Sequence, residues 1–259
     1  MRPGIRILVV EDSLINQRLA LGMLLKLGYR ADVAENGQAA LTALERGNYA
    51  AVLMDCQMPE MDGFAATAAI RQREGDGRHT PIIAMTANAM KGDRERCLAA
   101  GMDDYVAKPF RVEDLAAALA RWIGVPAEEG PAAAGDEAGD RTATGEPPVI
   151  DEEALLSLVQ LGMDLVTDVL VPFRQESAQR LPALAEAARR NDGEALRRAA
   201  HALKGDAVVV GAVELRALCL QLERLGREGR AREAPPLIDA VQVAFARAET
   251  ALAAIVERQ

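Results

Sequence analysis

The chain has 259 residues, half of them hydrophobic, which is enough for one large domain or two small ones, each with its own core. Acidic residues outnumber basic ones by 39 to 30 and no basic tract stands out, so nucleic acid is not an expected direct partner. No apolar run approaches the roughly 20 residues that span a bilayer, and no secretory signal opens the chain. The three widely spaced cysteines predict buried, reduced thiols in a cytoplasmic protein.

Short apolar runs alternate with amphipathic stretches over the first half of the chain. The runs expected as strands cover residues 5–10, 29–34, 49–54, 81–85 and 104–107. Helices are expected to begin near residues 14, 36, 63, 90 and 111, with Asn36 as one cap and Gly28 as one stop. Five such pairs within about 120 residues predict an α/β fold, a doubly wound five-stranded parallel sheet.

Polar residues follow the ends of four of these strands. Glu11 and Asp12 follow the first strand, Asp55 the third, Thr86 the fourth and Lys108 the fifth. The carboxyl ends of parallel strands lie along one edge, where such sheets bind ligands. Asp55 by itself is also compatible with a simple helix cap, but three acids, a hydroxyl and an ammonium converging on one edge predict a chemical site.

The composition changes after the fifth strand–helix pair. Residues 125–149 are rich in Pro, Gly, Ala and acids and lack periodicity, which predicts a flexible acidic linker. Only helical patterns follow: a short one after Asp151, then segments near 164–190, 194–210, 213–228 and 236–257. Pro172 and Pro182 predict a kink or break in the first long segment. We therefore expect three parts, a first domain (1–124), the linker (125–149) and an all-α four-helix bundle (150–259).

One histidine of the bundle has neighbours suited to chemistry. At 100° per residue, His201 lies off the apolar stripe of its helix, so its ring is expected to project into water. Lys204 at i+3 offers a positive charge, and Gly205 at i+4 leaves room for a partner. A lone helical histidine is usually structural, but this setting favours a nucleophile toward phosphorus. His79 lies in a loop and is interpreted as a surface residue. The expected core stripe comprises Leu196, Ala199, Ala200, Leu203 and Ala207.

Both halves resemble known families. Residues 5–122 resemble the receiver domain of two-component signalling, and residues 150–257 resemble a histidine phosphotransfer (HPt) domain. Asp206 departs from the HPt pattern, which usually has a small residue there, and its carboxylate is expected to weaken the field of Lys204 or to change partner choice. The receiver motifs are Glu11-Asp12, Asp55 with Met58-Pro59 and Asp62-Gly63, Thr86-Ala87, Tyr105 and Lys108-Pro109; the HPt motif is His201-Ala202-Leu203-Lys204-Gly205, followed by Gly211.

The receiver resemblance implies an aspartyl phosphate chemistry. Asp55 would accept a phosphoryl group, and Mg²⁺ would be held by Asp12, Asp55 and the backbone carbonyl of Gln57, with Glu11 acting through water. Hard oxygen ligands suit that ion, which neutralises the charge gathered in phosphoryl transfer. Lys108 would pair with a phosphoryl oxygen.

The resemblance also implies a switch and a second carrier. Thr86 would hydrogen-bond the phosphoryl group, and its movement would leave room for Tyr105 to turn inward. His201 would carry the group as a phosphoimidazole, stabilised by Lys204.

The expected function is therefore that of a phosphorelay protein whose partners are a histidine kinase and other receiver or HPt domains. No G-x-x-x-x-G-K-[ST] motif occurs, so we expect a phosphotransfer protein without its own ATP-binding kinase domain, either a free shuttle or part of a hybrid kinase. A phosphohydrolase would need a second acid two residues after Asp55, where Gln57 stands. A non-catalytic module with relic sites is the other alternative.

Overall fold

The structure is a computed structural model that describes residues 5–74, 77, 79–86, 91–108, 110–124 and 149–256. Its contacts divide the chain into two compact units, Met1–Ala138 and Gly139–Gln259. Residues 125–148 of the expected linker lie outside the described residues. No helix in the described ranges combines the length and the apolar character needed to cross a membrane.

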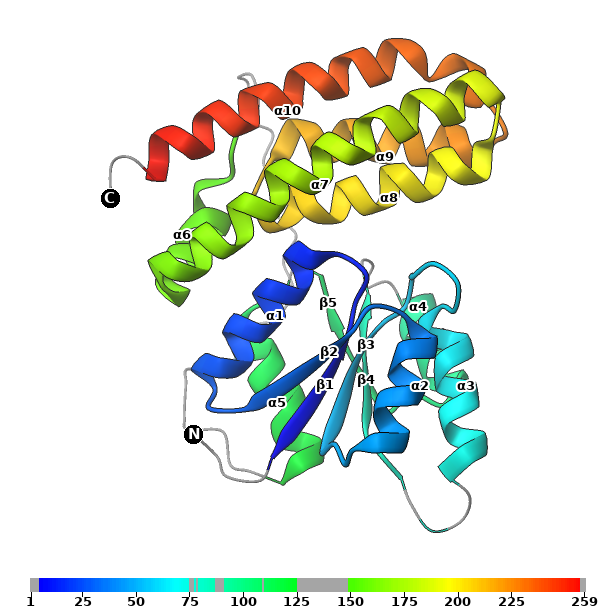
Figure 1. The fold of residues 1–259 in the computed structure, drawn as a ribbon, viewed down its shortest axis with the longest axis vertical. Helices are drawn as coiled ribbons and strands as arrows, with labels where there is room; N and C mark the ends of the chain where they lie inside the picture. Colours follow the sequence, from blue (N-terminus) through cyan, green and yellow to red (C-terminus); the bar gives the residue numbers. More distant parts are fainter. Residues whose placement is uncertain are drawn as a thin grey trace. The chain divides into compact units, whose positions relative to one another are not determined.

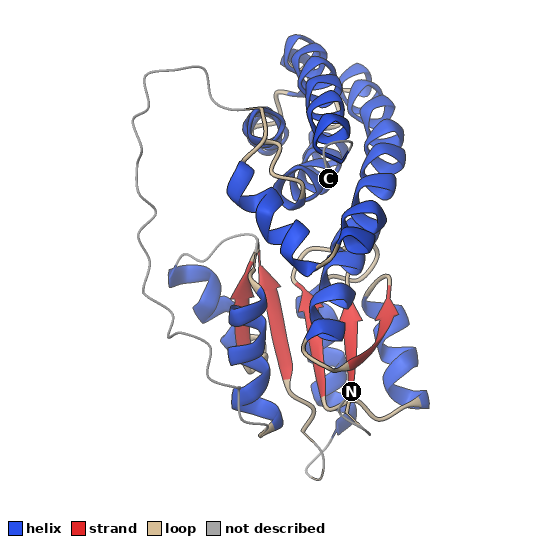
Figure 2. Cartoon of the chain, turned by 90° about the vertical axis from the view of Figure 1, so that its left-hand side faces the viewer, coloured by secondary structure: helices blue, strands red, loops and turns tan. Residues whose placement is uncertain are grey.

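The first unit is built on a parallel sheet with the strand order β2-β1-β3-β4-β5, which confirms the predicted doubly wound fold. All the strands point the same way (Figure 2). The strand order reverses between β1 and β3, and the carboxyl edge beside such a reversal is where open α/β sheets bind ligands. The strands are β1 (Arg6–Val10), β2 (Arg30–Ala34), β3 (Ala51–Asp55), β4 (Ile82–Thr86) and β5 (Asp104–Ala107).

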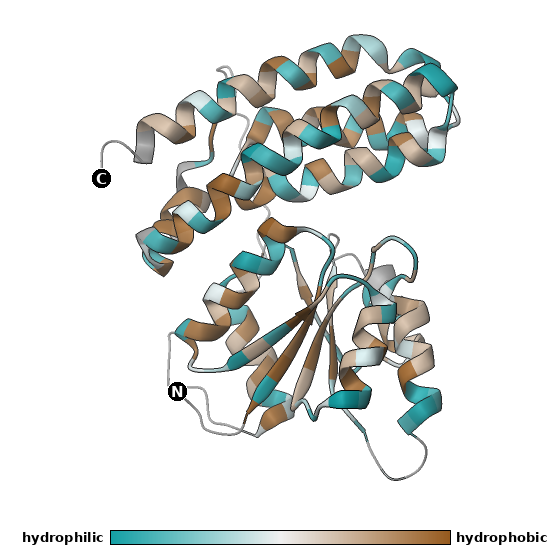
Figure 3. Ribbon diagram, in the orientation of Figure 1, coloured by the Kyte–Doolittle hydropathy of each residue, from teal (hydrophilic) through white to brown (hydrophobic). Residues whose placement is uncertain are grey.

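Helices cover both faces of this sheet. α1 and α5 lie on one face, and α2, α3 and α4 on the other (Figure 1). Because both faces are covered, β3 and β4 are buried along their whole length, as their continuous apolar sequences predict (Figure 3). Ser13, Asn36 and Asp62 accept hydrogen bonds from the first turns of α1, α2 and α3. The helices are α1 (Leu14–Lys26), α2 (Gly37–Arg46), α3 (Gly63–Glu74), α4 (Lys91–Ala99) and α5 (Val112–Ile123).

The second unit is helical and contains the four long helices expected for a bundle. Of the kink or break predicted at Pro172 and Pro182, the break is wrong, because α7 runs through both prolines as one helix. Packing explains this: Val169, Phe173 and Leu184 on the same helix are fully buried, and their burial offsets the loss of two backbone N–H donors. The elements are α6 (Glu152–Leu161), α7 (Met163–Arg190), α8 (Gly193–Val209), α9 (Val213–Arg227), the short 3₁₀ helix η1 (Ala231–Glu233) and α10 (Pro235–Val256).

Two glycines let α8 and α9 approach closely at one end. A Cβ on Gly193 would lie 2.5 Å from the carbonyl oxygen of Gly226, and a Cβ on Gly226 would lie 2.6 Å from that of Gly193. Neither position has room for a larger residue unless the helices separate. The backbone contact therefore fixes the spacing of the two helices that carry the second site described below.

Candidate functional site

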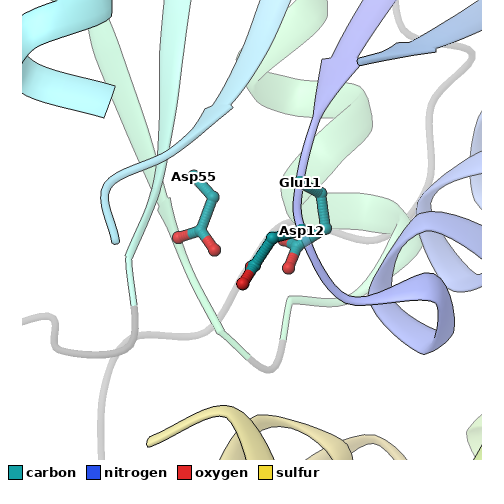
Figure 4. A group of neighbouring side chains, drawn as sticks. All are labelled: Glu11, Asp12 and Asp55. Carbon is teal, nitrogen blue, oxygen red and sulfur yellow. The ribbon is translucent and has the colours of Figure 1, made fainter. Parts of the chain in front are cut away.

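Three carboxylates meet at the carboxyl edge of the sheet. The register pairs Val10 of β1 with Met54 of β3, so the next residues along each strand, Glu11 and Asp55, become neighbours. Together with Asp12 they bring one carboxylate oxygen each within 4.8 Å of one another, and Figure 4 shows the three groups converging. Glu11 and Asp55 are buried, and Asp12 is the most open of the three.

Lys108 joins this cluster from the end of β5. Its Nζ donates to Glu11 Oε2 at 2.5 Å and lies 2.9 Å from Asp55 Oδ2. Burial alone would lower the pKa of Lys108, but the carboxylates of Asp55 and Glu11 raise it above its ordinary value. Lys108 therefore remains an ammonium and partly neutralises two buried acids.

Asp55 is poised between its two protonation states. Burial, with the neighbouring Glu11 carboxylate, raises the pKa of Asp55 to about 7, and Lys108 opposes that shift. An additional cation among the three acids would favour the ionised form, which is the form that can act as a nucleophile. The cluster is thus built to gain from binding positive charge.

The loop after β3 holds Asp55 closely. The backbone N–H of Gln57 donates to Asp55 Oδ1 at 3.3 Å, and Gly63 opens α3 directly against the main chain of Asp55. A Cβ on Gly63 would lie 2.1 Å from the Asp55 carbonyl oxygen, so only glycine fits. This close packing explains why glycine follows Asp62, the residue that caps α3.

Thr86 ends β4, and Tyr105 lies on β5, the strand that leads to Lys108. Thr86 is the buried last residue of β4, and its carbonyl accepts the backbone N–H of Lys108 at 2.6 Å. Tyr105 on β5 is half-buried, and the Arg94 guanidinium of α4 stands 6.0 Å from the centre of its ring. Ala87 and Pro109, which complete two of the predicted motifs, lie outside the described residues.

His201 lies on α8 and is neither sealed in the core nor projecting freely. Its side chain is 24% exposed, and its Nδ1 lies 2.8 Å from Glu223 Oε1 on α9. The expectation of a ring projecting into water is therefore corrected: one ring edge is held by a carboxylate that is only 9% exposed. Burial of Leu196, Ala200, Leu203 and Ala207 confirms that stripe of α8, but Ala199 is only half-buried.

Lys204 binds the same carboxylate rather than reaching into open space. Its Nζ lies 2.6 Å from Glu223 Oε1 and 3.4 Å from His201 Nδ1. These contacts make opposite demands on Nδ1, because a carboxylate accepts a proton there whereas an ammonium donates one. The shorter contact, to Glu223, decides in favour of Nδ1–H, which leaves Nε2 as the nitrogen with a free lone pair.

Glu223 was not identified from the sequence. Although burial alone would raise the pKa of Glu223, hydrogen bonds from His201 and Lys204 hold it below its ordinary value, so the carboxylate stays ionised at neutral pH. A signal did exist: Glu223 lies four residues after Cys219 and beside Leu222, on the buried stripe of α9. A charged residue on an apolar stripe requires a partner.

The interpretation of Asp206 needs correction, whereas that of His79 as a surface residue is confirmed. Asp206 does not lie beside Lys204; it is fully buried and forms an ion pair with Arg180 of α7, inside the bundle. His79 is exposed as expected but does have a neighbour, because its Nε2 lies 2.6 Å from Asp103 Oδ1. The three cysteines are buried thiols that form no disulfide, as predicted.

Comparison with known families agrees with both units. Residues 7–120 match the response regulator receiver domain, and residues 168–257 match the Hpt domain. The chain thus consists of a receiver domain followed by an Hpt domain, and it belongs to the proteins of phosphorelay signal transduction.

Several known proteins are similar to this chain. The sensor histidine kinase GacS of Pseudomonas protegens is 35% identical over 231 residues, which cover 88% of this chain and 25% of that protein. The chain therefore spans about a quarter of the length of this curated relative. The receiver domain of sensor histidine kinase PA1611 from Pseudomonas aeruginosa, solved with magnesium in its active-site cleft, is 51% identical. It covers 47% of this chain and 99% of its own, with a TM-score of 0.44.

A further solved structure is the Saccharomyces cerevisiae complex of the histidine phosphotransfer protein Ypd1 with the receiver domain of Ssk1. The matching chain is 32% identical and covers 46% of this chain and 89% of its own, with a TM-score of 0.43.

Proposed function

We propose that this protein carries a phosphoryl group at two positions, on Asp55 of the receiver and on His201 of the HPt domain, and passes it between them or to partner sites. The observation that carries the proposal is the convergence of Glu11, Asp55 and Lys108 on one sheet edge. Within the same chain, His201 has one ring nitrogen held by a carboxylate and the other left as nucleophile. We take the domains as 1–124 and 150–259, joined by the linker 125–149.

The acidic cluster suits a hard divalent cation, for which we propose Mg²⁺. Two oxygens that each lie about 2.1 Å from one ion are at most about 4.2 Å apart, so groups already within 4.8 Å need to close only slightly. Asp12, Asp55 and the backbone carbonyl of Gln57 would hold the ion, with Glu11 through water. When bound, it would neutralise charge on the transferring phosphoryl group.

At the receiver, an Asp55 oxygen attacks phosphorus as the bond from phosphorus to a donor nitrogen breaks. Lys108 then moves its ammonium to a phosphoryl oxygen, and the Thr86 hydroxyl donates to another. Tyr105 follows the shift of Thr86 and turns inward, away from Arg94, so that the surface around β5 and α4 reports the chemical state.

At the HPt domain, the Nε2 lone pair of His201 attacks the phosphorus of an aspartyl phosphate. The bond between phosphorus and the carboxylate oxygen breaks, and its electron pair returns to the carboxylate. The attack places positive charge on the imidazole ring, and Glu223 stabilises that charge through Nδ1–H. Lys204 holds the same Glu223 oxygen and so places a second positive charge beside the ring, where it would stabilise the negatively charged phosphoryl group.

The partners we propose are a histidine kinase and other receiver or HPt domains. The two domains of this chain accept and pass on a phosphoryl group, and the kinase would supply that group from ATP. The contact between a receiver and an HPt domain would resemble that of Ypd1 with the receiver domain of Ssk1. Because its cysteines are thiols and not disulfides, we propose the cytoplasm as its location. Two alternatives fit less well. A phosphohydrolase would need a second acid at position 57, where this chain has Gln57. A module with relic sites would not be expected to keep Lys108 paired with Asp55, or Glu223 in contact with the His201 ring.

The experiment is to label the full chain with radioactive acetyl phosphate and Mg²⁺ and to classify the label by its stability. An acyl phosphate is base-labile, and a phosphohistidine is acid-labile but base-stable. The wild-type protein should show both kinds of label, His201→Gln only the base-labile kind, and Asp55→Asn neither. Asp55→Asn protein that labels as well as wild type would contradict the acceptor assignment.

Mixing the two variants separates the routes of transfer. The His201→Gln chain keeps the receiver acceptor, and the Asp55→Asn chain keeps the HPt acceptor. Base-stable label on the Asp55→Asn chain in the mixture demonstrates transfer between chains. Base-stable label that appears in the second domain of His201→Gln protein would show that the carrier is a different residue.

A further inference from the structure

The side chain of Asn16, on α1, is hydrogen-bonded to the Glu11 carboxylate, one of the three in the acidic cluster. Glu11 is 1% exposed, and both of its oxygens are engaged: Oε2 accepts from Lys108 at 2.5 Å, and Oε1 accepts from the Asn16 side-chain amide at 3.0 Å. The backbone N–H of Ser13 makes a longer bond of 3.4 Å to the same Oε1. The carboxylate is therefore held from opposite sides, by one charged group and one neutral group.

The charged partner cannot stay in place while the protein works. Lys108 lies within hydrogen-bond distance of both Glu11 and Asp55, the two buried acids that would face an incoming cation. A divalent ion in the cluster repels the ammonium, and the proposed chemistry draws Lys108 toward the phosphoryl group. Oε2 of Glu11 then loses the partner that holds it.

The neutral partner has no such conflict. Asn16 lies in the first turn of α1, where its backbone N–H donates to the N-cap Ser13 at 3.4 Å. Its amide carries no charge, so a cation beside Glu11 does not expel it. Its neighbour Gln17 is buried and donates from its side chain to the Glu11 main-chain carbonyl at 2.8 Å. The Gln17 amide therefore contacts only the main chain of Glu11, whereas the Asn16 amide contacts the carboxylate itself.

We infer that Asn16 is a positioning residue for the divalent cation of the receiver. Its amide keeps the Glu11 carboxylate turned into the cluster when Lys108 moves away. Hydrogen-bonding groups that surround a metal site without touching the ion commonly change metal affinity by about 10- to 100-fold when they are removed, and Glu11, which would reach the ion through water, belongs with its Asn16 partner to these groups. The inference rests on the proposed function, because it requires the cluster to bind Mg²⁺.

The test is a calorimetric titration of the full chain with Mg²⁺ alone, without any phosphodonor. Asn16→Ala should raise the Kd for Mg²⁺ about tenfold or more. Gln17→Ala is the matched control, because it removes an equivalent amide from the next residue but leaves the carboxylate bond intact. Its Kd should stay within about threefold of wild type. Thermal unfolding in EDTA compares the stability that each variant loses.

The outcomes are separable. Wild-type protein that binds no Mg²⁺ would overturn the metal site itself, and this inference with it. Wild-type binding together with an unchanged Kd for Asn16→Ala would overturn the positioning role while leaving the metal site standing. Equal weakening by both variants would point to general damage at the start of α1 and would also overturn it. If Asn16→Ala does not fold, Asn16→Ser, which can reach Glu11 through water, should give an intermediate Kd, and an unchanged Kd overturns the proposal.

Discussion

Glu223 offers the sharpest test of how the HPt site works. Glu223→Gln keeps the shape of the side chain but replaces the carboxylate that accepts from His201 Nδ1 at 2.8 Å. A hydrogen bond to a charged group contributes about 1.5–3 kcal/mol, against about 0.5–1.5 kcal/mol for a neutral one. The midpoints of these ranges differ by about 1.25 kcal/mol, which corresponds to nearly tenfold in an equilibrium or a rate. We therefore expect Glu223→Gln to slow transfer from Asp55 phosphate to His201 about tenfold.

The direction follows from the tautomer. Glutamate can only accept, so it fixes the proton on Nδ1 and leaves Nε2 as nucleophile. Glutamine can also donate its amide N–H to Nδ1, which holds the proton on Nε2 instead, and it cannot stabilise the charged ring that forms during attack.

Two measurements check this reasoning. Rapid-quench radiolabelling gives the transfer rate, and ¹⁵N chemical shifts of the imidazole report which ring nitrogen of His201 carries the proton. Glu228→Gln is the matched control, because Glu228 lies at the exposed C-terminal cap of the same helix and pairs with Arg230 rather than with the histidine. Wild-type protein with the proton on Nε2, or a Glu223→Gln rate within twofold of the control, would refute the argument.

Three further predictions concern the stability of the bundle and can be measured by urea unfolding followed by circular dichroism. Arg180→Met takes the cation away from the buried carboxylate of Asp206 and should cost about 3–5 kcal/mol, whereas the double variant with Asp206→Leu should recover most of it; equal losses in both would contradict the role of the ion pair. Gly226→Ala places a methyl group against the Gly193 carbonyl and should cost about 1–3 kcal/mol; an unchanged midpoint would mean that the helices separate without penalty. Folding depresses the pKa of Glu223, so its carboxylate contributes to the free energy of unfolding above the ordinary pKa near 4.5, and this contribution is lost as the pH falls through the lower folded-state pKa. The wild-type protein should therefore lose stability more steeply below pH 4.5 than Glu223→Gln. Parallel pH profiles of the two proteins would argue against this.

The receiver half follows from the sequence because its information is local. The central strands β1, β3 and β4 are largely apolar runs, and each functional side chain lies at the end of a strand or directly after it, so the parallel topology alone gathers Glu11, Asp55 and Lys108. The hydrogen bonds of Asn16 were not predicted, because they depend on how α1 returns over the end of β1.

The HPt half depends on contacts between helices, which a helical periodicity does not reveal. The position of His201 on its own helix could be derived, but the residue that orients it lies 22 positions later on α9. Asp206 was misplaced for the same reason: its partner Arg180 belongs to a different helix. In both cases the sequence offered one signal, a charged residue on the buried stripe of a helix. That signal shows that the residue requires a partner, but the sequence of a single helix does not show which residue the partner is.

The paired glycines of α8 and α9 set the distance between the helix that carries His201 and the helix that carries Glu223. Glu223 lies one turn from Gly226, where the backbone of α9 touches that of α8. This contact sets the distance that the Glu223 side chain must span to meet the His201 ring. A bundle with bulkier residues there would hold its helices farther apart, and a carboxylate of this length would no longer meet the ring. Substitution of these glycines should therefore change the rate of the proposed phosphoryl transfer even though Glu223 and Lys204, the residues in contact with His201, stay the same.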